Sequence, residues 1–559
     1  MASFDLDRFR ELAFGRRALP DHPMQSLAEA KKIVALLPDN DPDRALAEIT
    51  HWAASMNATD AFTPGRRARV LMELDTAIRP HWRQQAARYL APAGRPKPGR
   101  EGDAKLLRAM FDCVTETSNG YAIALDAEKG ESGWLEKNRA RVCLRNMRAL
   151  MRRLALAHML KHTGTAATWE RLHRRHALCE ELGVARSLLP VFDGDSATSA
   201  VRLEYAHGLL LELAAPESLL GREVELVFRI ARRIAASVRI EQERFDDAWF
   251  AVVPSGDARP IPIARLGRRA AGRTLYIGTA NCLTRLQSVL ERDLGHDEGE
   301  SDTLYGVDEF TLGERTRILK RLLEHWGPKP PQRRTPRIGM ATPVRIVSGF
   351  ERVAGVVPPI EKRGTGSADQ ARRRLNMQLD ATTNALKRSS ISAARENPAR
   401  LVDASAGGMG IAIRRKDAAW ASLGMLVAVL IEPGKTWAIG VLRRIYTVDD
   451  ELRLGVQTLS AKPVAVTLRT DTVLQDSVWE EALRFEENYK ERYRTGILLE
   501  PQQLPLSGAD LLLPPGLASR GTQFNVPLTQ GGEQRIRVAR LLDEGEHYQR
   551  AMIESLGLA

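Results

Sequence analysis

The sequence predicts a multidomain α+β protein with a helical N-terminal region, a small mixed segment, a small antiparallel β-barrel and a C-terminal β-rich region. Three observations support this fold class. The chain has 559 residues, which is too long for a single hydrophobic core. Apolar residues recur at helical spacing through residues 1–235. From about residue 340 onward, alternating apolar residues are punctuated by Gly and Asp, as expected for short antiparallel strands.

Residues 1–235 are expected to form a helical region. Val70, Leu71, Leu74 and Ile78 fall on one helical face, and Thr63-Pro64 before them suits a helix start. Similar patterns follow along this region without a fixed period, so we expect a helical bundle rather than a solenoid.

Residues 236–327 are expected to form a mixed α/β segment. The stretches 248–253 and 273–278 are typical of strands, and 281–294 is typical of a helix. A second amphipathic helix is predicted over 313–326, where Ile318, Leu319, Leu322, Leu323 and Trp326 share one side and Gly327-Pro328 ends it. This helix would connect the N-terminal part to the barrel.

Residues 328–463 are expected to form the barrel. The proline-rich stretch 328–337 must be extended, and strand-like segments follow at 342–357, 399–413, 423–432, 436–448 and 452–459. A charged insertion at 359–398 is poor in apolar residues, and we expect it to lie outside the barrel as a mobile or partly helical segment.

Residues 464–559 contain further strand candidates at 494–501, 522–528 and 534–543, together with two helical pieces. Two interpretations stay open for this region. It forms either a second small β domain or an extension packed on the barrel.

Composition limits the location and the partners. Lys and Arg (82) exceed Asp and Glu (70), and the net charge of +12 favours anionic partners, although many Arg-rich proteins carry such a charge without using it. The four cysteines have no paired spacing, which fits a reducing compartment. Acids near the N-terminus do not suit a signal peptide, and the longest apolar stretch, 423–431, is too short for a membrane helix. We expect a cytoplasmic protein without membrane insertion.

Two polar motifs flank the first predicted barrel strands. Arg333 and Arg337 have the spacing R-x-x-x-R on the extended segment, with Arg334 between them. A guanidinium group is a planar fork that binds phosphate oxygens or the guanine O6/N7 edge, and its face stacks on purines. These arginines therefore suit a nucleotide with exposed phosphates.

The second motif is D-x-S-x-x-G, formed by Asp403, Ser405 and Gly408 at a turn between two strands. An ionised Asp accepts hydrogen bonds from guanine N1–H and N2–H₂, and a Ser hydroxyl donates or accepts. Gly407 and Gly408 allow a tight turn and a close approach to a ligand. Together with the arginines, they predict a guanine-nucleotide site.

Over residues 330–462 this order of motifs resembles the PilZ domain family, whose members are bacterial receptors for cyclic di-GMP. The resemblance implies a PilZ-like barrel in which Arg333 and Arg337 grip guanines and phosphates, with help from Arg334. It also implies that Asp403 and Ser405 contact a guanine edge and that Gly408 shapes the turn. Motility, pili, biofilm or exopolysaccharide control are the outputs it suggests, with a protein partner acting through residues 1–235.

One feature departs from the family pattern, because 66 positions separate Arg337 from Asp403 and the insertion 359–398 supplies the excess. Its own arginines, Arg372, Arg373, Arg374 and Arg388, are alternative ligand contacts, although no convincing strand follows them. A further alternative is that the barrel keeps the fold without the ligand.

No catalytic motif is evident, so we expect a binding protein rather than an enzyme, with cyclic di-GMP as a regulatory ligand. Two histidine-containing patterns, His158-x₃-His162 and His173-x₂-His176-x₂-Cys179, have helical metal-ligand spacing. Neighbouring Lys and Arg oppose a dication, so we expect no metal site. The alternative functions are a ligand-independent adaptor for protein partners and, less favoured, a nucleic-acid-binding protein that uses the +12 charge.

Overall fold

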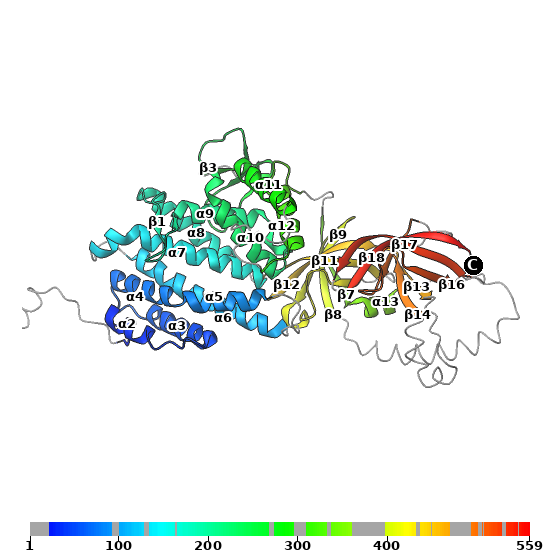
Figure 1. Ribbon diagram of the computed structural model, residues 1–559, viewed down its shortest axis with the longest axis horizontal. Coiled ribbons are helices and arrows are strands. Elements are labelled where there is room, and N and C mark those ends of the chain that lie inside the picture. The colour runs from blue at the N-terminus through cyan, green and yellow to red at the C-terminus, as the bar shows by residue number, and fades with distance from the viewer. Residues whose placement is uncertain are drawn as a thin grey trace, which may run out of the picture. The chain divides into compact units, whose positions relative to one another are not determined.

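The structure is a computed structural model that describes residues 22–91, 100–127, 133–161, 165–267, 273–295, 309–331, 337–359, 397–431, 437–448, 450–469, 493–500, 506, 508–527, 533–545 and 547–558. The chain divides into two compact units, which we call unit 1 (Met1–Pro331) and unit 2 (Gln332–Ala559). Unit 1 is mainly helical and unit 2 is built of strands (Figure 1). The predicted fold class is confirmed.

Unit 1 is a helical bundle joined to a small sheet. Within it, α7 packs against α4, α6, α8, α9 and α10, so it lies at the centre of the bundle (Figure 1). The helices are α2 (Leu27–Val34), α3 (Pro42–Asn57), α4 (Pro64–Ala77), α5 (Arg79–Leu90), α6 (Arg100–Asp126), α7 (Gly133–Met159), α8 (Thr165–Glu181), α9 (Val201–Leu213), α10 (Gly221–Ile234), α11 (Ala280–Gly295) and α12 (Leu312–His325).

The predicted helix start at Thr63-Pro64 is confirmed. The Thr63 side chain caps α4 by accepting from the Arg66 N–H, Pro64 is its first residue, and the helix buries Val70 and Leu74. Among the described residues, none of the helices combines the length and the apolar character that crossing a membrane requires.

The mixed segment belongs to the same hydrophobic core as the bundle. Its antiparallel sheet has the order β3-β6-β4-β5, and Ile240, Phe250 and Ile277 from these strands join the core of the helices. The strands are β3 (Arg239–Glu241), β4 (Ala248–Val252), β5 (Ile261–Pro262) and β6 (Leu275–Gly278), and a two-stranded pair, β1 (Leu189–Pro190) and β2 (Thr198–Ser199), lies between α8 and α9 in the sequence.

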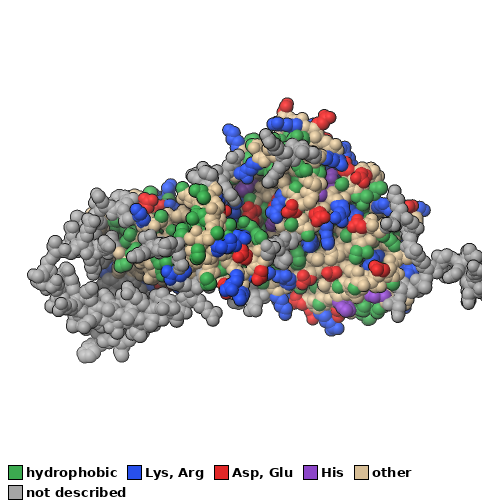
Figure 2. Space-filling model, turned by 180° about the vertical axis from the view of Figure 1, so that it is seen from behind, with side chains coloured by type: hydrophobic (Ala, Val, Ile, Leu, Met, Phe, Trp, Pro, Cys, Tyr) green, Lys and Arg blue, Asp and Glu red, His purple; other side chains and the backbone are tan. Residues whose placement is uncertain are grey.

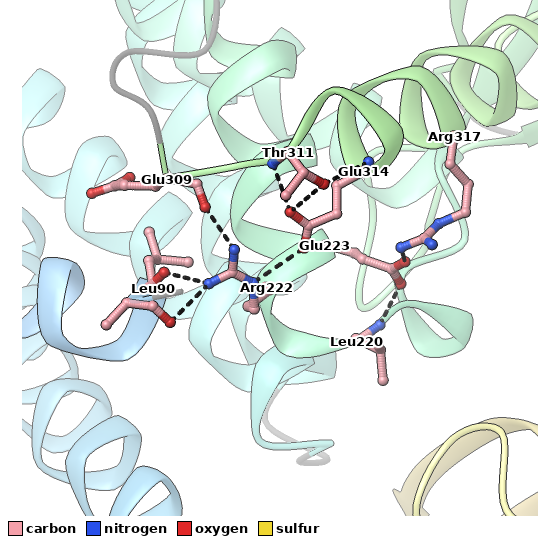
Figure 3. A network of polar contacts seen from close by, with 9 residues as sticks. Leu90, Leu220, Arg222, Glu223, Glu309, Thr311, Glu314 and Arg317 are labelled. Carbon is pink, nitrogen blue, oxygen red and sulfur yellow. Dashed lines mark hydrogen bonds and ion pairs between the residues drawn. The ribbon is translucent and has the colours of Figure 1, made fainter. Parts of the chain in front are cut away.

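The predicted connecting helix is α12, and charged contacts fasten it to the bundle (Figure 3). Arg222, at the start of α10, donates to the backbone carbonyl groups of Leu90 and Glu309 and lies 3.3 Å from the Glu314 carboxylate. Arg317 pairs with Glu223 at 2.6 Å. Trp326, which follows α12, is fully buried and donates to the Leu210 carbonyl at 3.0 Å. The helix is therefore a fixed part of unit 1.

Unit 2 contains two closed six-stranded antiparallel barrels (Figure 1). The first has the order β10-β11-β12-β9-β8-β7, and the second has the order β13-β14-β15-β18-β17-β16. The strands are β7 (Ile338–Ser348), β8 (Asn397–Ser405), β9 (Gly408–Arg414), β10 (Leu426–Ile431), β11 (Trp437–Val448), β12 (Glu451–Ser460), β13 (Val464–Arg469), β14 (Tyr493–Leu498), β15 (Asp510–Leu513), β16 (Gln523–Pro527), β17 (Glu533–Gly545) and β18 (Tyr548–Leu558).

One local expectation in unit 2 was wrong. The expected strand 342–357 ends at Ser348, because Gly349 has a φ of 85° and the chain then forms α13 (Phe350–Val356), which buries Phe350 and Val353. The two helical pieces expected within 464–559 are not tested in full, because 470–492 lies outside the described residues; the described part of that region holds strands, and 548–558 is β18. Most of the insertion 359–398 (360–396) lies outside the described residues.

The second barrel and α13 cover part of the outer surface of the first barrel. Outward side chains of β7, β10 and β11 form one apolar cluster with α13 and with residues of β14, β15 and β18, including Ala428, Val441, Val353, Leu512 and Tyr548. The interior of the first barrel is a separate cluster. Among the described residues, β8 and β9 contribute no side chain to the shared cluster, and β12 packs only Leu459, near its end, against it. The candidate site lies on the outer surface of β8, β9 and β12, away from that contact.

Strands β9 and β12 approach closely at Gly408. A Cβ atom at this position would lie nearer to the Val456 carbonyl oxygen than real Cβ atoms do, so only glycine fits without moving the strand. Its neighbour Gly407, in the two-residue turn between β8 and β9, has open space around its Cα.

Buried carboxylates tie the helices of unit 1 together, and Glu212 of α9 is the clearest case. It pairs with His158 at 3.2 Å, accepts from the Trp169 indole at 3.1 Å and pairs with Arg259 at 3.0 Å. Burial alone would raise the pKa of Glu212, but His158, Arg259 and the Trp169 hydrogen bond together lower it to about 2.

Glu212→Gln should destabilise unit 1 in a pH-dependent way. The lowered pKa means that the charged form stabilises the fold fully above the ordinary pKa of about 4.5, and that this stabilisation is lost as the pH falls toward 2. The destabilisation should be on the order of 3 kcal/mol near neutral pH and should shrink below about pH 4.5. Urea unfolding followed by helical circular dichroism measures it. The exposed Glu170→Gln is the control, and a loss of equal size at every pH would contradict this assignment.

Gly408→Ala should lower the free energy of unfolding of unit 2 by about 1–3 kcal/mol, because the new Cβ meets the Val456 carbonyl group. Gly407→Ala is the matched control and should change this free energy by less than about 0.5 kcal/mol. Hydrogen exchange of the β9 and β12 amides reports both changes. Equal protection in the two variants would show that the close approach at Gly408 is not a constraint.

Candidate functional site

The structure brings Arg337 and Asp403 into direct contact. Arg337 lies immediately before β7, Asp403 lies in β8, and a guanidinium nitrogen of Arg337 donates to the Asp403 carboxylate. The two side chains are 21% and 29% exposed, so the ion pair is partly buried and still open to a ligand. Residues separated by 66 positions therefore meet at one place on the first barrel.

The ion pair lies over a bare glycine on the neighbouring strand. Asp403 faces Gly410 across β8 and β9, and a Cβ atom on Gly410 would collide with the Asp403 carboxylate and lie 3.1 Å from Arg337 Nη1. Cross-strand pairing extends this row outward on both sides, from Gly339 in β7 to Gly455 in β12 and Arg444 in β11. Three glycines therefore share one row on the outer surface, which we call the strip. Gly339 has open space around it, whereas the Asp403 carboxylate lies over Gly410 and the Arg444 side chain lies over Gly455.

A second row of side chains runs beside this strip, about 7 Å further along the strands. It contains Arg400 of β8, Arg453 of β12 and Tyr446 of β11, a residue that is 45% exposed. Glu451 pairs with Arg400 at 3.2 Å and with Arg453 at 3.0 Å. The outer surface around the ion pair thus presents several guanidinium groups and one exposed aromatic ring.

The other residues of the second motif shape the hairpin. Ser405 ends β8 and Gly408 begins β9, and the Ser405 hydroxyl donates to the Gly408 carbonyl at 3.2 Å. Gly408 is required by the close approach to β12, as described above. Gly407 lies in the turn between the two strands, as expected, with open space around its Cα and without a positive φ.

Several predicted contacts lie outside the described residues. These are Arg333 and Arg334 of the first motif and the alternative arginines Arg372, Arg373, Arg374 and Arg388. Of the R-x-x-x-R motif, the structure places Arg337 alone.

The histidines of unit 1 have neighbours that explain their burial. His158 pairs with Glu212, as described above, and His162 lies outside the described residues. His173 contacts the Tyr205 hydroxyl at 2.9 Å and the Ala258 carbonyl at 2.7 Å, and His176 stacks on the Tyr205 ring. Burial lowers the pKa of His176 to about 4, with nearby arginines adding to the effect, so its ring is neutral at physiological pH.

Sequence reasoning missed the strip itself. Gly410 alternates with the inward residues Met409 and Ile411, so its outward direction follows from the strand pattern, but its position opposite Asp403 depends on the register. Tyr446 and Arg453 come from β11 and β12, and the sequence alone gives no signal that joins them to Asp403.

The face of unit 1 that Figure 2 shows is not uniformly basic. On the helical part of the surface shown in Figure 2, Lys and Arg side chains are interspersed with Asp and Glu. Some arginines are also buried and used structurally. Arg67 is 2% exposed and donates to the Met56 and Thr59 carbonyl groups, and Arg145 is 1% exposed and bonds to the Val191 carbonyl.

Comparison with known proteins relates unit 1 to a described domain. A search of the curated proteins gives no match to the chain. Residues 28–244 match the family model described as "Cyclic-di-GMP receptor FimW, N-terminal domain". The match runs from α2 to just past β3 and lies within unit 1. Over this N-terminal part, the chain is similar to the N-terminal domain of a cyclic di-GMP receptor.

Proposed function

We propose that this protein is a PilZ-type receptor that binds cyclic di-GMP on the outer surface of β8, β9 and β12. The contact between Arg337 and Asp403 carries the proposal, because it joins the arginine motif and the D-x-S-x-x-G motif at one place. The match of residues 28–244 to the N-terminal domain of a cyclic di-GMP receptor supports the same ligand independently of the barrel.

In the ligand-free protein, Arg337 and Asp403 satisfy each other. A guanine nucleotide offers both residues better partners, since the guanine N1–H and N2–H₂ suit the carboxylate and a phosphate or O6/N7 edge suits the guanidinium. Binding would thus replace one charged contact by two. The exposed Tyr446 ring and the flat faces of neighbouring guanidinium groups supply surfaces on which a purine stacks.

The three glycines of the strip add no side chains of their own, so the side chains of Arg337, Asp403 and Arg444 are the groups that a base would meet there. The second barrel occupies the opposite outer surface, at β10 and β11, and so leaves this strip as the place for a ligand. The protein would bind the dinucleotide without transforming it.

Signalling would pass through the chain that joins the two units. Five residues separate Pro331 from Arg337, and α12 before them is fastened to unit 1 by Arg222 and by the buried Trp326. On ligand binding, Arg337 would make new contacts, as would Arg333 according to the resemblance. These contacts would act on the segment that joins the barrel to the fixed helix α12. The resemblance suggests motility, pili or biofilm as the output, reached through a partner of unit 1.

Arg337→Ala and Asp403→Ala should each weaken cyclic di-GMP binding by about 1–3 kcal/mol, the value of one good charged contact. Isothermal titration calorimetry on the full chain measures this change. The matched control is the pair Arg414 and Asp417, which lie 2.8 Å apart elsewhere on the same barrel, and their Ala variants should bind as wild type.

Wild-type protein that does not bind cyclic di-GMP would overturn the proposal and favour a ligand-independent adaptor. Binding to DNA that falls steeply with salt would instead favour the nucleic-acid function.

Cyclic di-GMP should also change hydrogen exchange within residues 313–337, because the ligand acts on a segment attached to α12. Mass spectrometry of the full chain with and without ligand measures this, and Arg337→Ala should remove the change. Unaltered exchange across 313–337 at saturating ligand would contradict the proposed route while leaving the binding site itself intact.

A further inference from the structure

Unit 1 contains a pocket of about 420 Å³ between α3, α6, α7 and α8. Its polar lining includes the side chains of Asn57, Asn119, Asn146, Arg171, Arg174 and Arg175. This volume falls in the range of roughly 300–1,000 Å³ that is typical of small-molecule sites. The pocket lies within the helical region and involves none of the barrel residues discussed above.

The pocket has a basic side formed by α8. Arg171, Arg174 and Arg175 are three and four positions apart, so they lie on one face of the helix. Arg175 is only 3% exposed; its Nε donates to Asn146 at 3.1 Å and its Nη2 to Asp126 at 2.9 Å.

The Nη1 of Arg175 is buried and has no hydrogen-bond partner. A buried charged donor without a partner is costly, and an anionic oxygen in the pocket would remove that cost. Asp126 pairs with Arg175 at 2.9 Å and Glu170 pairs with Arg174 at 3.0 Å, so the three guanidinium groups of α8 exceed these carboxylates by one positive charge. The pocket therefore favours an anion.

The opposite side offers an unused acceptor. Asn57 donates from Nδ2 to Glu116 at 2.9 Å, but its Oδ1 is buried without a partner. It comes so close to α6 that a Cβ on Gly120 would lie 2.7 Å from this oxygen. This oxygen is buried against Gly120, so a ligand N–H or O–H would satisfy it only after the Asn57 side chain turns away from α6. Ile123 and Leu150 add apolar surface for a ring.

We propose that this pocket is a second ligand site, which takes a nucleoside monophosphate or a phosphorylated heterocycle of similar size. The phosphate would meet Arg171 and Arg175, the base would present donors and acceptors to the asparagine amides, and its ring would lie against the apolar lining. Unit 1 would then respond to a small nucleotide separately from any ligand of the barrel.

The test is calorimetric titration of the full chain with GMP and AMP, and with guanosine and inorganic phosphate as separate arms. We expect at least one nucleotide to bind, and both partial probes to bind at least tenfold more weakly. Asn119→Asp is the informative variant. Asn119 Oδ1 accepts from Arg171, so an aspartate keeps that bond and the side-chain shape while adding a negative charge beside the expected phosphate.

Asn119→Asp should weaken nucleotide binding by roughly ten- to a hundredfold, with the unfolding temperature unchanged. Asn40→Asp places the same charge at an exposed position outside the pocket and is the matched control. Arg171→Gln removes one guanidinium and should weaken nucleotide binding as well. It is the variant to test if Asn119→Asp does not fold.

Three results would overturn the proposal: no binding of either nucleotide, inorganic phosphate binding as tightly as the nucleotides, or unchanged affinity in both pocket variants. Asp403→Ala separates the two sites. Asp403→Ala should leave the binding of GMP and AMP unchanged. Loss of that binding in Asp403→Ala would show that the nucleotide binds to the barrel instead.

Discussion

The ion pair between Arg337 and Asp403 is the interaction on which the account of the barrel depends. It is made across a bare glycine, so the strand register of β8 and β9 fixes where the two charges meet. A partly buried ion pair of this kind adds little to stability, because desolvation offsets most of its attraction. Its value lies in holding a guanidinium and a carboxylate side by side, each with an alternative partner available in a guanine nucleotide.

The rest of unit 2 determines which surface is open. Apolar side chains of β10 and β11 are covered by α13 and the second barrel, and the outer surface around Arg337 and Asp403 lies outside this contact. In unit 1, α12 is fixed by Arg222, and Trp326 behind it is fully buried. The chain therefore leaves unit 1 from a fixed helix, and the proposed signalling route depends on this feature.

The sequence predicts those features that depend on local pattern. Thr63-Pro64 and the spacing of Val70 and Leu74 locate α4, and the residues from Asp403 to Gly408 fall at the predicted hairpin. It does not predict features that depend on long-range register or on one backbone angle. Gly349 turns a strand-like pattern into α13, and Gly410 acquires its role only from the residue opposite it. The net charge did not by itself indicate an anionic partner. Arg145 and other arginines are buried within unit 1 and donate to its own carbonyl groups.

The most direct test of the central claim exchanges the two charges in one protein, Arg337→Asp with Asp403→Arg. The exchanged pair can form again across Gly410, so the free energy of unfolding should return to near the wild-type value. Cyclic di-GMP would need the guanidinium at position 337 and the carboxylate at position 403. We therefore expect its affinity for the exchanged protein to stay low although the stability is restored. Wild-type affinity in the exchanged protein would show that the pair is structural and that the nucleotide binds elsewhere.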